Sequence, residues 1–350
     1  MKEIIIDNID AGQRFDKYLC KLLPEAGKSF IYKMLRKKNI VLNNKKSDGS
    51  EKISQGDIVK IFFSDETFDK FSHSDKIPQN KNYDNIIKNK VKTLDIIYED
   101  DNIVIVNKPS GVLSQKAKPD DISINEIIGS YIMSDFDKKK EQSFKPGICN
   151  RLDRNTSGIV VAGKNIHGLQ TMSAAFHDRT IYKYYICIVK GVFTKRQCLN
   201  GFIRKDETGN IVTILSEDEF NQINPSDRNN YSPVNTEFIP VAHSNDISLV
   251  KVHLITGKTH QIRAHLKHIG YPIAGDYKYG SSSFNDYMKK NYQIKDQMLH
   301  AYELIIPVKA YPDLNDDLHI TTCIPEEFVR VLKGEDIWQP GIQEVLGALH

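Results

Sequence analysis

A short run of charged and polar residues, from Arg151 to Ser157, has the composition of a catalytic loop. It precedes GIVVAG at 158–163, an apolar stretch that predicts a short buried strand. Loops at the ends of such strands often hold functional groups. Asp153 lies between Arg151 and Arg154, and nearby positive charge favours its ionised form. A carboxylate in this position could act as a nucleophile or as a general base.

A structural role for the same loop is the alternative. Asp153 and Asn155 could form an Asx-turn, in which the side chains accept hydrogen bonds from the backbone ahead of the strand. The residues alone leave both interpretations open. Ser157 is not part of a G-x-S-x-G sequence, so we interpret it as a hydrogen-bonding loop residue rather than as the nucleophile of a hydrolase.

The histidines and cysteines do not have the spacing of a metal site. His260 and His265 lie five residues apart, which places them about 140° around a helix from each other. His265 and His268 lack the glutamate between them that H-E-x-x-H requires. The five cysteines are scattered and form no C-x-x-C pair. We therefore expect no bound metal, and free thiols in a reducing compartment.

The elements that must position these residues fall into three parts. Residues 1–63 contain two short stretches of helical periodicity followed by short strand-like runs, which predicts a small separate domain. Residues 64–90 are polar and mixed in charge, which predicts a flexible linker. Residues 91–350 mix strand and helix patterns with hairpin signals and have no regular βαβ period. We therefore expect an α+β domain there, built around a mostly antiparallel mixed sheet.

Positive charge is concentrated in the first of these parts. Residues 1–62 contain 13 Lys and Arg against 8 Asp and Glu, whereas the whole chain has a net charge of +3. Residues 28–46 contain seven basic side chains and no acidic one. Three of these side chains share one face of a predicted helix: Lys33, Arg36 and Lys37. A solvated surface is the simpler interpretation, but so much positive charge without local acids favours binding to nucleic acid.

Length and hydropathy exclude several classes of protein. The 350 residues are 40% hydrophobic, which is enough to bury a sizeable core. Mean hydropathy is −0.43, and no apolar run approaches the roughly 18 residues of a membrane span. The first ten residues lack the hydrophobic region of a signal peptide. We therefore expect a cytoplasmic protein without membrane association.

The loop at 151–158, RLDRNTSG, resembles the signature of the RluA family of pseudouridine synthases. Three further segments resemble family motifs in the same order: NKPSGV at 107–112, KYYICIVKG at 183–191 and TGKTHQIRAHLKHIGYPIAGDYKYG at 256–280. KSFIYKMLRKKNIVLN at 28–43 is similar to the S4-like RNA-binding domain that many members carry in front. Several ordered motifs make a chance match improbable. The resemblance implies a pseudouridine synthase catalytic domain in the third part of the chain and an S4-like domain in the first.

The resemblance also implies roles for three residues. Asp153 matches the catalytic aspartate of a reaction that breaks the N-glycosidic bond of uridine, rotates the base and rejoins it through carbon 5; whether the aspartate acts at the base or at the ribose stays open. Tyr185 matches the tyrosine that stacks on the target base and assists loss of the carbon 5 proton, and in an alternating strand it faces away from Tyr184. Arg263 matches the arginine that pairs with the aspartate, and we expect a bidentate pair. The reaction is an isomerisation, so it requires no cofactor.

Further positions of the family concern RNA contacts. Lys108 and Lys183 fit positions near phosphate or the base pocket. Asn150 replaces the histidine that usually precedes the Arg-Leu-Asp sequence, and we expect it to hydrogen-bond RNA or backbone. The residues that we expect to bind RNA are Lys33, Arg36, Lys37, Lys108, Arg151, Arg154 and Lys183.

The front domain looks most like that of RluC-type members, which implies uridines of large-subunit (23S) ribosomal RNA as substrate. The enzyme would flip the uridine out of its stack, in free RNA or in an assembling large subunit, and we expect it to work as a monomer. A transfer RNA substrate is one alternative. A non-catalytic RNA-binding ribosome-assembly factor is another, although the three catalytic residues are present. A nucleoside or glycoside hydrolase has only Asp153 in its favour.

Overall fold

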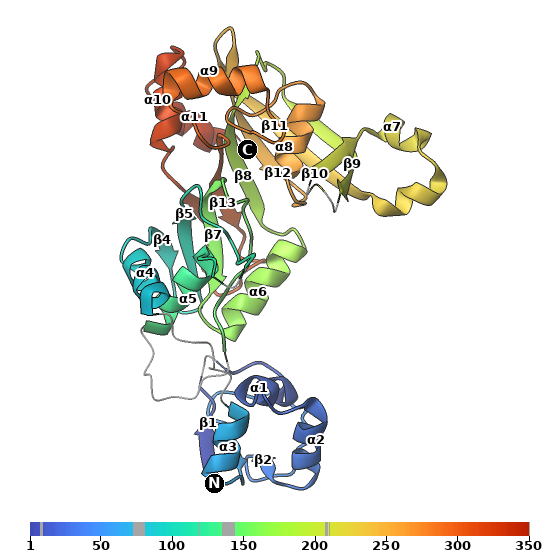
Figure 1. Cartoon of the computed structure of the whole chain (residues 1–350), viewed down its shortest axis with the longest axis vertical. Helices are drawn as coiled ribbons and strands as arrows, with labels where there is room; N and C mark the ends of the chain where they lie inside the picture. Colours follow the sequence, from blue (N-terminus) through green and yellow to red (C-terminus); the bar gives the residue numbers. More distant parts are fainter. Residues whose placement is uncertain are drawn as a thin grey trace. The chain divides into compact units, whose positions relative to one another are not determined.

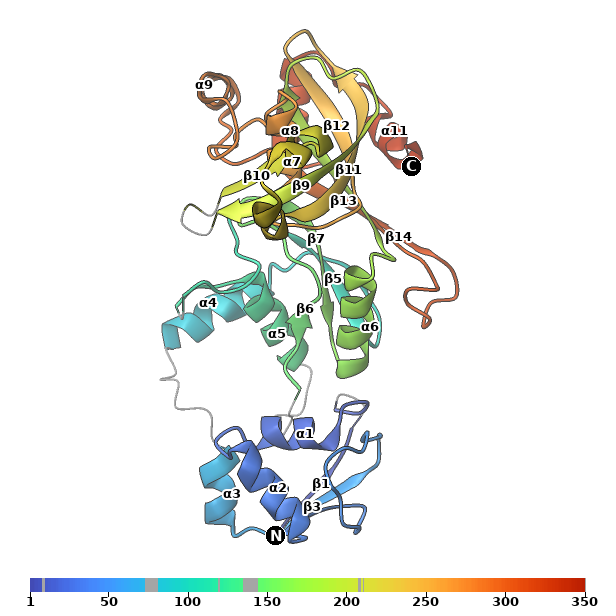
Figure 2. The ribbon, with the colours of Figure 1, turned by 90° about the vertical axis from the view of Figure 1, so that its right-hand side faces the viewer.

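The computed structural model describes residues 1–7, 10–72, 81–118, 120–134, 144–206, 209 and 211–349. The chain divides into two compact units, each made of several segments (Figures 1 and 2). Unit 1 comprises Met1–Ile105, Gln115–Asn150 and Val161–Ala174, and unit 2 comprises Val106–Ser114, Arg151–Val160 and Ala175–His350. No helix among the described residues is long and apolar enough to cross a membrane.

The N-terminal part of unit 1 is a small sheet packed with helices. Its strands are β1 (Lys2–Ile5), β2 (Ile40–Leu42) and β3 (Ile58–Ile61), in the antiparallel order β1-β3-β2. Helices α1 (Phe15–Leu22) and α2 (Lys28–Arg36) present apolar residues three and four positions apart to one core. The most buried of these core residues are Phe15, Tyr18, Leu19, Ile31 and Leu35.

The predicted linker at 64–90 is wrong in part, because much of it is helical. Helix α3 (Asp65–Ser72) belongs to the small domain: Phe68 is 1% exposed in its core, and the Phe71 ring lies 4.7 Å from that of Phe30. A second helix, α4, covers Lys81–Val91. The small domain therefore ends at Ser72 rather than at residue 63, and residues 73–80 lie outside the described part of the chain.

The rest of unit 1 contains short strands and two capped helices. Strands β5 and β7 begin in one unit and end in the other. The elements are β4 (Ile96–Glu99), β5 (Ile103–Lys108), α5 (Ile124–Ser134), β6 (Gly147–Ile148), β7 (Ser157–Gly163) and α6 (Ile166–His177). Asn165 caps α6 by accepting a hydrogen bond from the Gly168 amide at 2.8 Å. Glu126 in the first turn of α5 accepts hydrogen bonds from the backbone and hydroxyl of Ser123.

Unit 2 is built on a strongly twisted sheet. Its further strands are β8 (Tyr182–Lys190), β9 (Gln197–Asp206), β10 (Ile211–Leu215), β11 (Ser232–His243), β12 (Ile247–Leu254), β13 (Leu299–Ile306) and β14 (Leu318–Thr321). The order is β10-β9-β11-β12-β8-β13-β7, with β14 beside β13. Neighbours in this path are antiparallel except β13 and β7, which are parallel. The predicted α+β fold with a mostly antiparallel sheet is confirmed.

The helices of unit 2 follow or interrupt this sheet. They are α7 (Glu217–Gln222), the 3-10 helix η1 (Pro225–Asn230), α8 (Gln261–His268), α9 (Ser282–Tyr292), α10 (Glu326–Gly334) and α11 (Ile342–Ala348). Helix α8 carries Arg263 and is therefore the helix that matters most for the site. Its residue Ala264 packs into an apolar cluster with Ile203 of β9 and Ile214 of β10. This packing fixes the helix, and therefore its polar side chains, against the sheet.

Candidate active site

The loop that carries Asp153 is fixed by its backbone. Leu152, directly before the aspartate, donates its amide to the Ser114 hydroxyl at 2.9 Å, and that hydroxyl donates back to the Leu152 carbonyl at 2.7 Å. At the end of the loop, Gly158 has a φ of +113°, and a Cβ there would overlap the Ala301 backbone on β13. Only glycine fits this close approach. The Asp153 side chain remains 26% exposed, so substrate can reach it.

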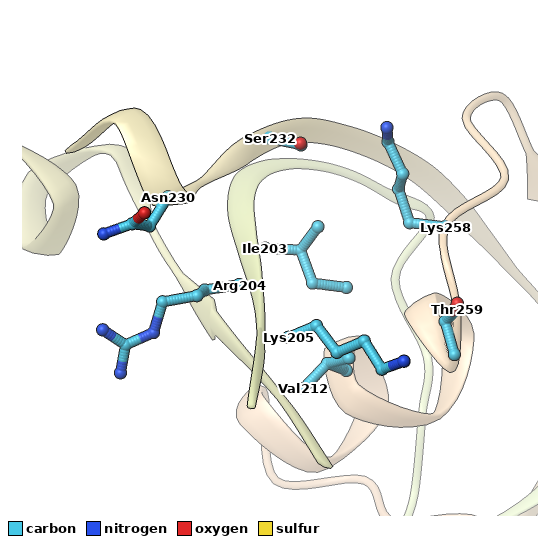
Figure 3. A pocket seen from close by; sticks show the side chains of 8 residues that line it. All are labelled: Ile203, Arg204, Lys205, Val212, Asn230, Ser232, Lys258 and Thr259. Atoms are coloured by element: carbon cyan, nitrogen blue, oxygen red, sulfur yellow. The ribbon is translucent and has the colours of Figure 1, made fainter. Parts of the chain in front are cut away.

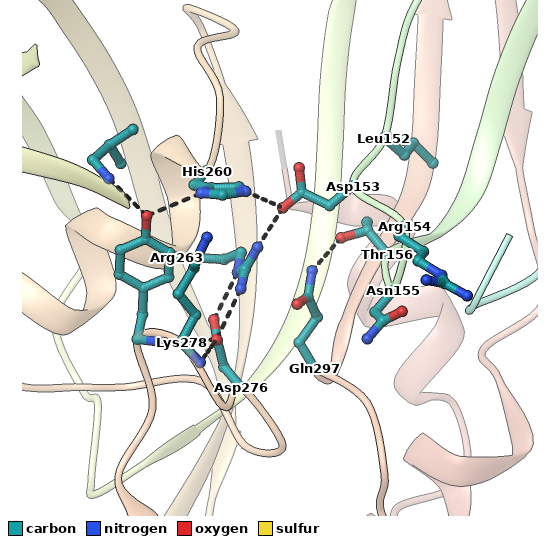
Figure 4. Close-up of polar contacts among 12 residues, drawn as sticks. Leu152, Asp153, Arg154, Asn155, Thr156, His260, Arg263, Asp276, Lys278 and Gln297 are labelled. Atoms are coloured by element: carbon teal, nitrogen blue, oxygen red, sulfur yellow. Dashed lines mark hydrogen bonds and ion pairs between the residues drawn. The ribbon is translucent and has the colours of Figure 1, made fainter. Parts of the chain in front are cut away.

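Arg263, on α8, donates from Nη1 to Oδ2 of Asp153 at 2.7 Å (Figure 4). The predicted pair between the two residues is therefore present, but it is not bidentate. The bidentate partner is Asp276, whose Oδ2 accepts from Nε at 2.7 Å and whose Oδ1 accepts from Nη2 at 2.9 Å. Among the described residues, no hydrogen bond reaches Oδ1 of Asp153. One oxygen of Asp153 is thus held by the arginine, while the other accepts no hydrogen bond from the described residues.

Asp276 is the anchor of this arrangement. It is 1% exposed, and its carboxylate also accepts the backbone amides of Lys278 at 2.9 Å and Tyr279 at 3.0 Å. Burial opposes its ionisation, but the hydrogen bonds and charge of Arg263 outweigh that cost and lower its pKa. Asp276 lies within the motif at 256–280, yet spacing along the chain does not show which carboxylate meets the arginine.

His260 is a second residue that sequence reasoning missed, because it was weighed only as a metal ligand. It precedes α8 in a left-handed conformation, with φ +54°, and its Nε2 lies 3.8 Å from Oδ2 of Asp153. Its Nδ1 contacts the Tyr279 hydroxyl at 2.9 Å, and that hydroxyl accepts the Val212 amide at 2.8 Å. The tyrosine proton is then available to Nδ1, which leaves the histidine proton on Nε2, facing Asp153. Burial lowers the pKa of His260, although Asp153 opposes this shift.

Tyr185 lies on β8 and is only 8% exposed. Burial raises the pKa of its phenol, and the negative charge of Asp153 adds to the rise. Its neighbour Tyr184 packs on the opposite face of the sheet, with its ring 4.7 Å from that of His253 and the Lys251 ammonium 4.5 Å above it. The predicted alternation of the two tyrosines is confirmed.

Lys108 is buried, so the prediction that it contacts RNA is wrong. Its side chain is 0% exposed, and its ammonium donates to the carbonyls of Pro109 at 3.0 Å, Val112 at 2.9 Å and Arg154 at 3.1 Å. Burial lowers its pKa to about 8, although Asp153 opposes the shift. The lysine instead ties the NKPSGV segment to the loop that carries Asp153.

The other residues expected to contact RNA have varied surroundings. Arg151 and Arg154 are exposed, and Arg154 also donates to the Gly111 carbonyl at 3.1 Å. Lys183 is half-buried, and chiefly this burial lowers its pKa. Asn150 accepts the Val161 amide at 2.8 Å, so its side chain bonds the backbone. The remaining three are exposed in the small domain, two of them on α2 and one directly after its end: Lys33, Arg36 and Lys37.

Ser157 has a structural environment, as expected. Its hydroxyl contacts Nδ1 of His300 at 2.8 Å, and Nε2 of that histidine contacts the Thr322 hydroxyl at 2.6 Å. The preceding Thr156 accepts from Gln297 at 2.8 Å (Figure 4). These contacts hold the end of the loop that carries Asp153. In the part of the chain that the structure describes, no group of three His, Cys, Asp or Glu side chains is arranged to hold a metal ion.

Comparisons with known proteins agree with this geometry. The family model described as RNA pseudouridylate synthase matches residues 102–268, which contain Asp153, Tyr185 and Arg263. The chain is 32% identical to "Ribosomal large subunit pseudouridine synthase C" of Vibrio parahaemolyticus over 94% of this chain and 95% of that protein. It is 29% identical to the protein of the same name from Rickettsia bellii, over 94% of this chain and 100% of that one.

Two solved structures share the fold. "Human RNA Pseudouridylate Synthase Domain Containing 4" matches with a TM-score of 0.57 and 20% identity, over 74% of this chain and 99% of that one. "Human RNA Pseudouridylate Synthase Domain Containing 1" matches with a TM-score of 0.53 and 22% identity, over 74% and 96%. Fold and site together thus define an RNA-modifying isomerase. The chain belongs to the RNA pseudouridine synthase family, and the resemblance to its RluA branch is confirmed.

Proposed function

We propose that this enzyme converts uridines of large-subunit ribosomal RNA to pseudouridine, with Asp153 as the catalytic carboxylate. The observation that carries the proposal is the 2.7 Å contact between Arg263 and one oxygen of the partly exposed Asp153. The names of the relatives in Vibrio and Rickettsia support the ribosomal substrate. Transfer RNA is the substrate to test if ribosomal RNA is not modified.

The arginine keeps the carboxylate ready to react. Its Nη1 holds Oδ2 of Asp153, and the two hydrogen bonds to Asp276 keep the guanidinium from rotating away. Preorganised charge of this kind avoids reorganisation during the reaction. The free oxygen of Asp153 can then attack the flipped nucleotide or take a proton from it, which aids cleavage of the bond between the ribose and nitrogen 1.

After the base rotates and bonds to the ribose through carbon 5, the proton on carbon 5 must leave. Tyr185 is a poor acceptor for that proton because its raised pKa keeps the phenol neutral near pH 7. We therefore assign Tyr185 the role of a ring that packs on the base and a hydroxyl that donates a hydrogen bond. Asp153, released from its first role, is the better proton acceptor.

We assign RNA binding without sequence preference to the small N-terminal domain, which we infer to be S4-like. The exposed side chains of Lys33, Arg36 and Lys37, on α2 and directly after its end, support this role, because phosphate contacts provide most of such affinity. All five cysteines are free, which fits a reducing cytoplasm. We infer that the enzyme acts as a monomer.

The test is release of tritium from carbon-5-labelled uridine in a large-subunit ribosomal RNA transcript. Wild-type protein should release tritium, and Asp153→Asn should release none while still binding RNA in a filter assay. Assembling large subunits and transfer RNA are tested in parallel, which separates the substrate from the chemistry. Release by Asp153→Asn at the wild-type rate would contradict the catalytic assignment. Binding by wild type without release from any of these substrates would favour a non-catalytic factor.

A further inference from the structure

A pocket of about 450 Å³ opens on unit 2, beside β9, β10 and the start of α8 (Figure 3). Its lining combines three basic side chains, three small polar ones and two apolar ones. They are Arg204, Lys205, Lys258, Asn230, Ser232, Thr259, Ile203 and Val212. We call this site the basic pocket. Its volume is within the range of small-ligand sites and is sufficient for one nucleotide.

The charge of the basic pocket points to an anionic occupant. No carboxylate is among its lining residues. Lys205 and Lys258 are exposed, and neither side chain has an ion-pair partner among the described residues. In Figure 3 Lys258 is drawn above Ile203 and Lys205 below it, and Ile203 and Val212 supply the apolar part of the lining. Cations above an apolar surface suit a phosphate attached to a base rather than an isolated inorganic ion.

The basic pocket is connected to the catalytic carboxylate by a short series of contacts. Val212 lines the pocket and donates its amide to the Tyr279 hydroxyl at 2.8 Å. That hydroxyl contacts His260 at 2.9 Å, and His260 lies 3.8 Å from Asp153. Lys258 also lies only two residues before His260 in the chain. An occupant of the pocket would therefore lie close to the nucleotide that reacts with Asp153.

We propose that the basic pocket binds a nucleotide of the RNA substrate that neighbours the target uridine. Its phosphate contacts Lys205 and Lys258, its base lies on Ile203 and Val212, and the small polar side chains contact the edge of the base. This inference rests on the proposed function. A neighbouring nucleotide held in this way helps to keep the target uridine out of its stack, and it gives the catalytic domain a preference of its own for certain RNA sites.

The test is a Lys205→Gln/Lys258→Gln double variant, with Lys289→Gln/Lys290→Gln on α9 as its control. The control removes two exposed lysines from the same unit. Tritium release from labelled transcript is measured at several salt concentrations. For the pocket variant we expect kcat/KM to fall about tenfold, with little loss of the single-turnover rate at saturating RNA. The slope of log kcat/KM against log salt should become shallower by about 0.7, because the contact with one phosphate of single-stranded RNA is lost.

Equal kcat/KM and equal slopes for the pocket variant and the control would overturn the inference. A lower saturating rate with an unchanged salt slope would also overturn it, because that result indicates a distorted site and not a lost phosphate contact. Thermal melts of both variants verify folding. If wild-type protein releases no tritium, the proposed function has failed by itself. The pocket is then tested by the salt slope of filter binding with the same transcript and the same pair of variants.

Discussion

Arg263 donates two hydrogen bonds to the buried Asp276 and only one to the partly exposed Asp153. The carboxylate that fixes the arginine is therefore not the one expected to react. This division of roles lets Asp153 change its charge and its contacts while the guanidinium stays in place. A single bidentate pair between Arg263 and Asp153 would have to break whenever Asp153 engaged substrate.

Asp276→Asn tests this division. The substitution keeps the shape of the side chain but leaves the buried guanidinium with one charged partner fewer. We expect the free energy of unfolding to fall by about 3 kcal/mol and kcat to fall at least tenfold. Urea unfolding and tritium release measure the two effects. Asp286→Asn, an exposed change on α9, is the control, and a variant of Asp276 that matched it in both assays would contradict the anchoring role.

Lys108→Met separates a structural role from an RNA contact. Loss of the ammonium leaves three carbonyls without their donor, so stability should fall by about 3 kcal/mol and activity should fall with it. The salt dependence of RNA binding should not change, because this lysine is buried. Arg151→Gln, at an exposed position, should have the opposite effects. Its urea unfolding should match that of wild type, but its RNA affinity should depend less on salt concentration. A shallower slope for Lys108→Met would restore it as a phosphate contact.

Buried histidines should make stability depend on pH. Burial lowers the pKa of His265 to about 4 and that of His300 to about 3. As pH falls below about 6.5, unfolded chains bind protons on these imidazoles that folded chains do not, so the free energy of unfolding decreases. Each histidine contributes up to about 1.4 kcal/mol per pH unit until its folded pKa is reached.

The measurement is urea unfolding of His300→Gln between pH 6.5 and 5, compared with wild type. Its pH slope should be shallower by about 1 kcal/mol per unit averaged over this range, whatever the change in absolute stability. His177→Gln is the control for removal of a histidine at the surface, because that side chain is 87% exposed. Identical slopes for His300→Gln and wild type would show that His300 already titrates normally in the folded protein.

The corrected boundary of the small domain predicts the behaviour of two truncations. Removal of residues 1–63 leaves Phe68 and Phe71 of α3 without the core that covers them, so this variant should aggregate. Removal of residues 1–72 takes α3 away with its core and should give a monodisperse protein with weaker, less salt-dependent RNA binding. Size-exclusion chromatography and filter binding test both variants. Equal solubility of the two would mean that α3 does not depend on the small domain.

Sequence patterns correctly predicted the features that depend on periodicity, namely which side chains share a face of a strand or a helix. Tyr184 and Tyr185 face opposite sides of the sheet, as strand alternation requires, and the basic face of α2 lies opposite its buried Ile31. The same reasoning failed for α3, because Phe68 and Phe71 give only two apolar positions in a polar segment. A weak helical pattern of this kind becomes stable only when tertiary packing covers it.

The sequence did not show which residues contact each other in the folded chain. Lys108 and Lys183 are both lysines near family motifs, yet one is buried on three carbonyls and the other is half-exposed. Asp153 and Asp276 lie 110 and 13 residues from Arg263, and the chain gives no sign of how the arginine divides its donors between them. Both outcomes depend on loop conformation, which local propensity does not determine.

The loop around Asp153 is held by Ser114, Lys108 and the close approach of Gly158 to β13. None of these anchors uses the side chain of Arg151, and among the described residues that of Arg154 donates to a single carbonyl, that of Gly111. The position of Asp153 therefore depends little on the side chains of its two neighbouring arginines. We therefore expect substitutions at the two arginines to change which RNA is accepted without moving Asp153, so that new target sites evolve while the position of this carboxylate stays the same.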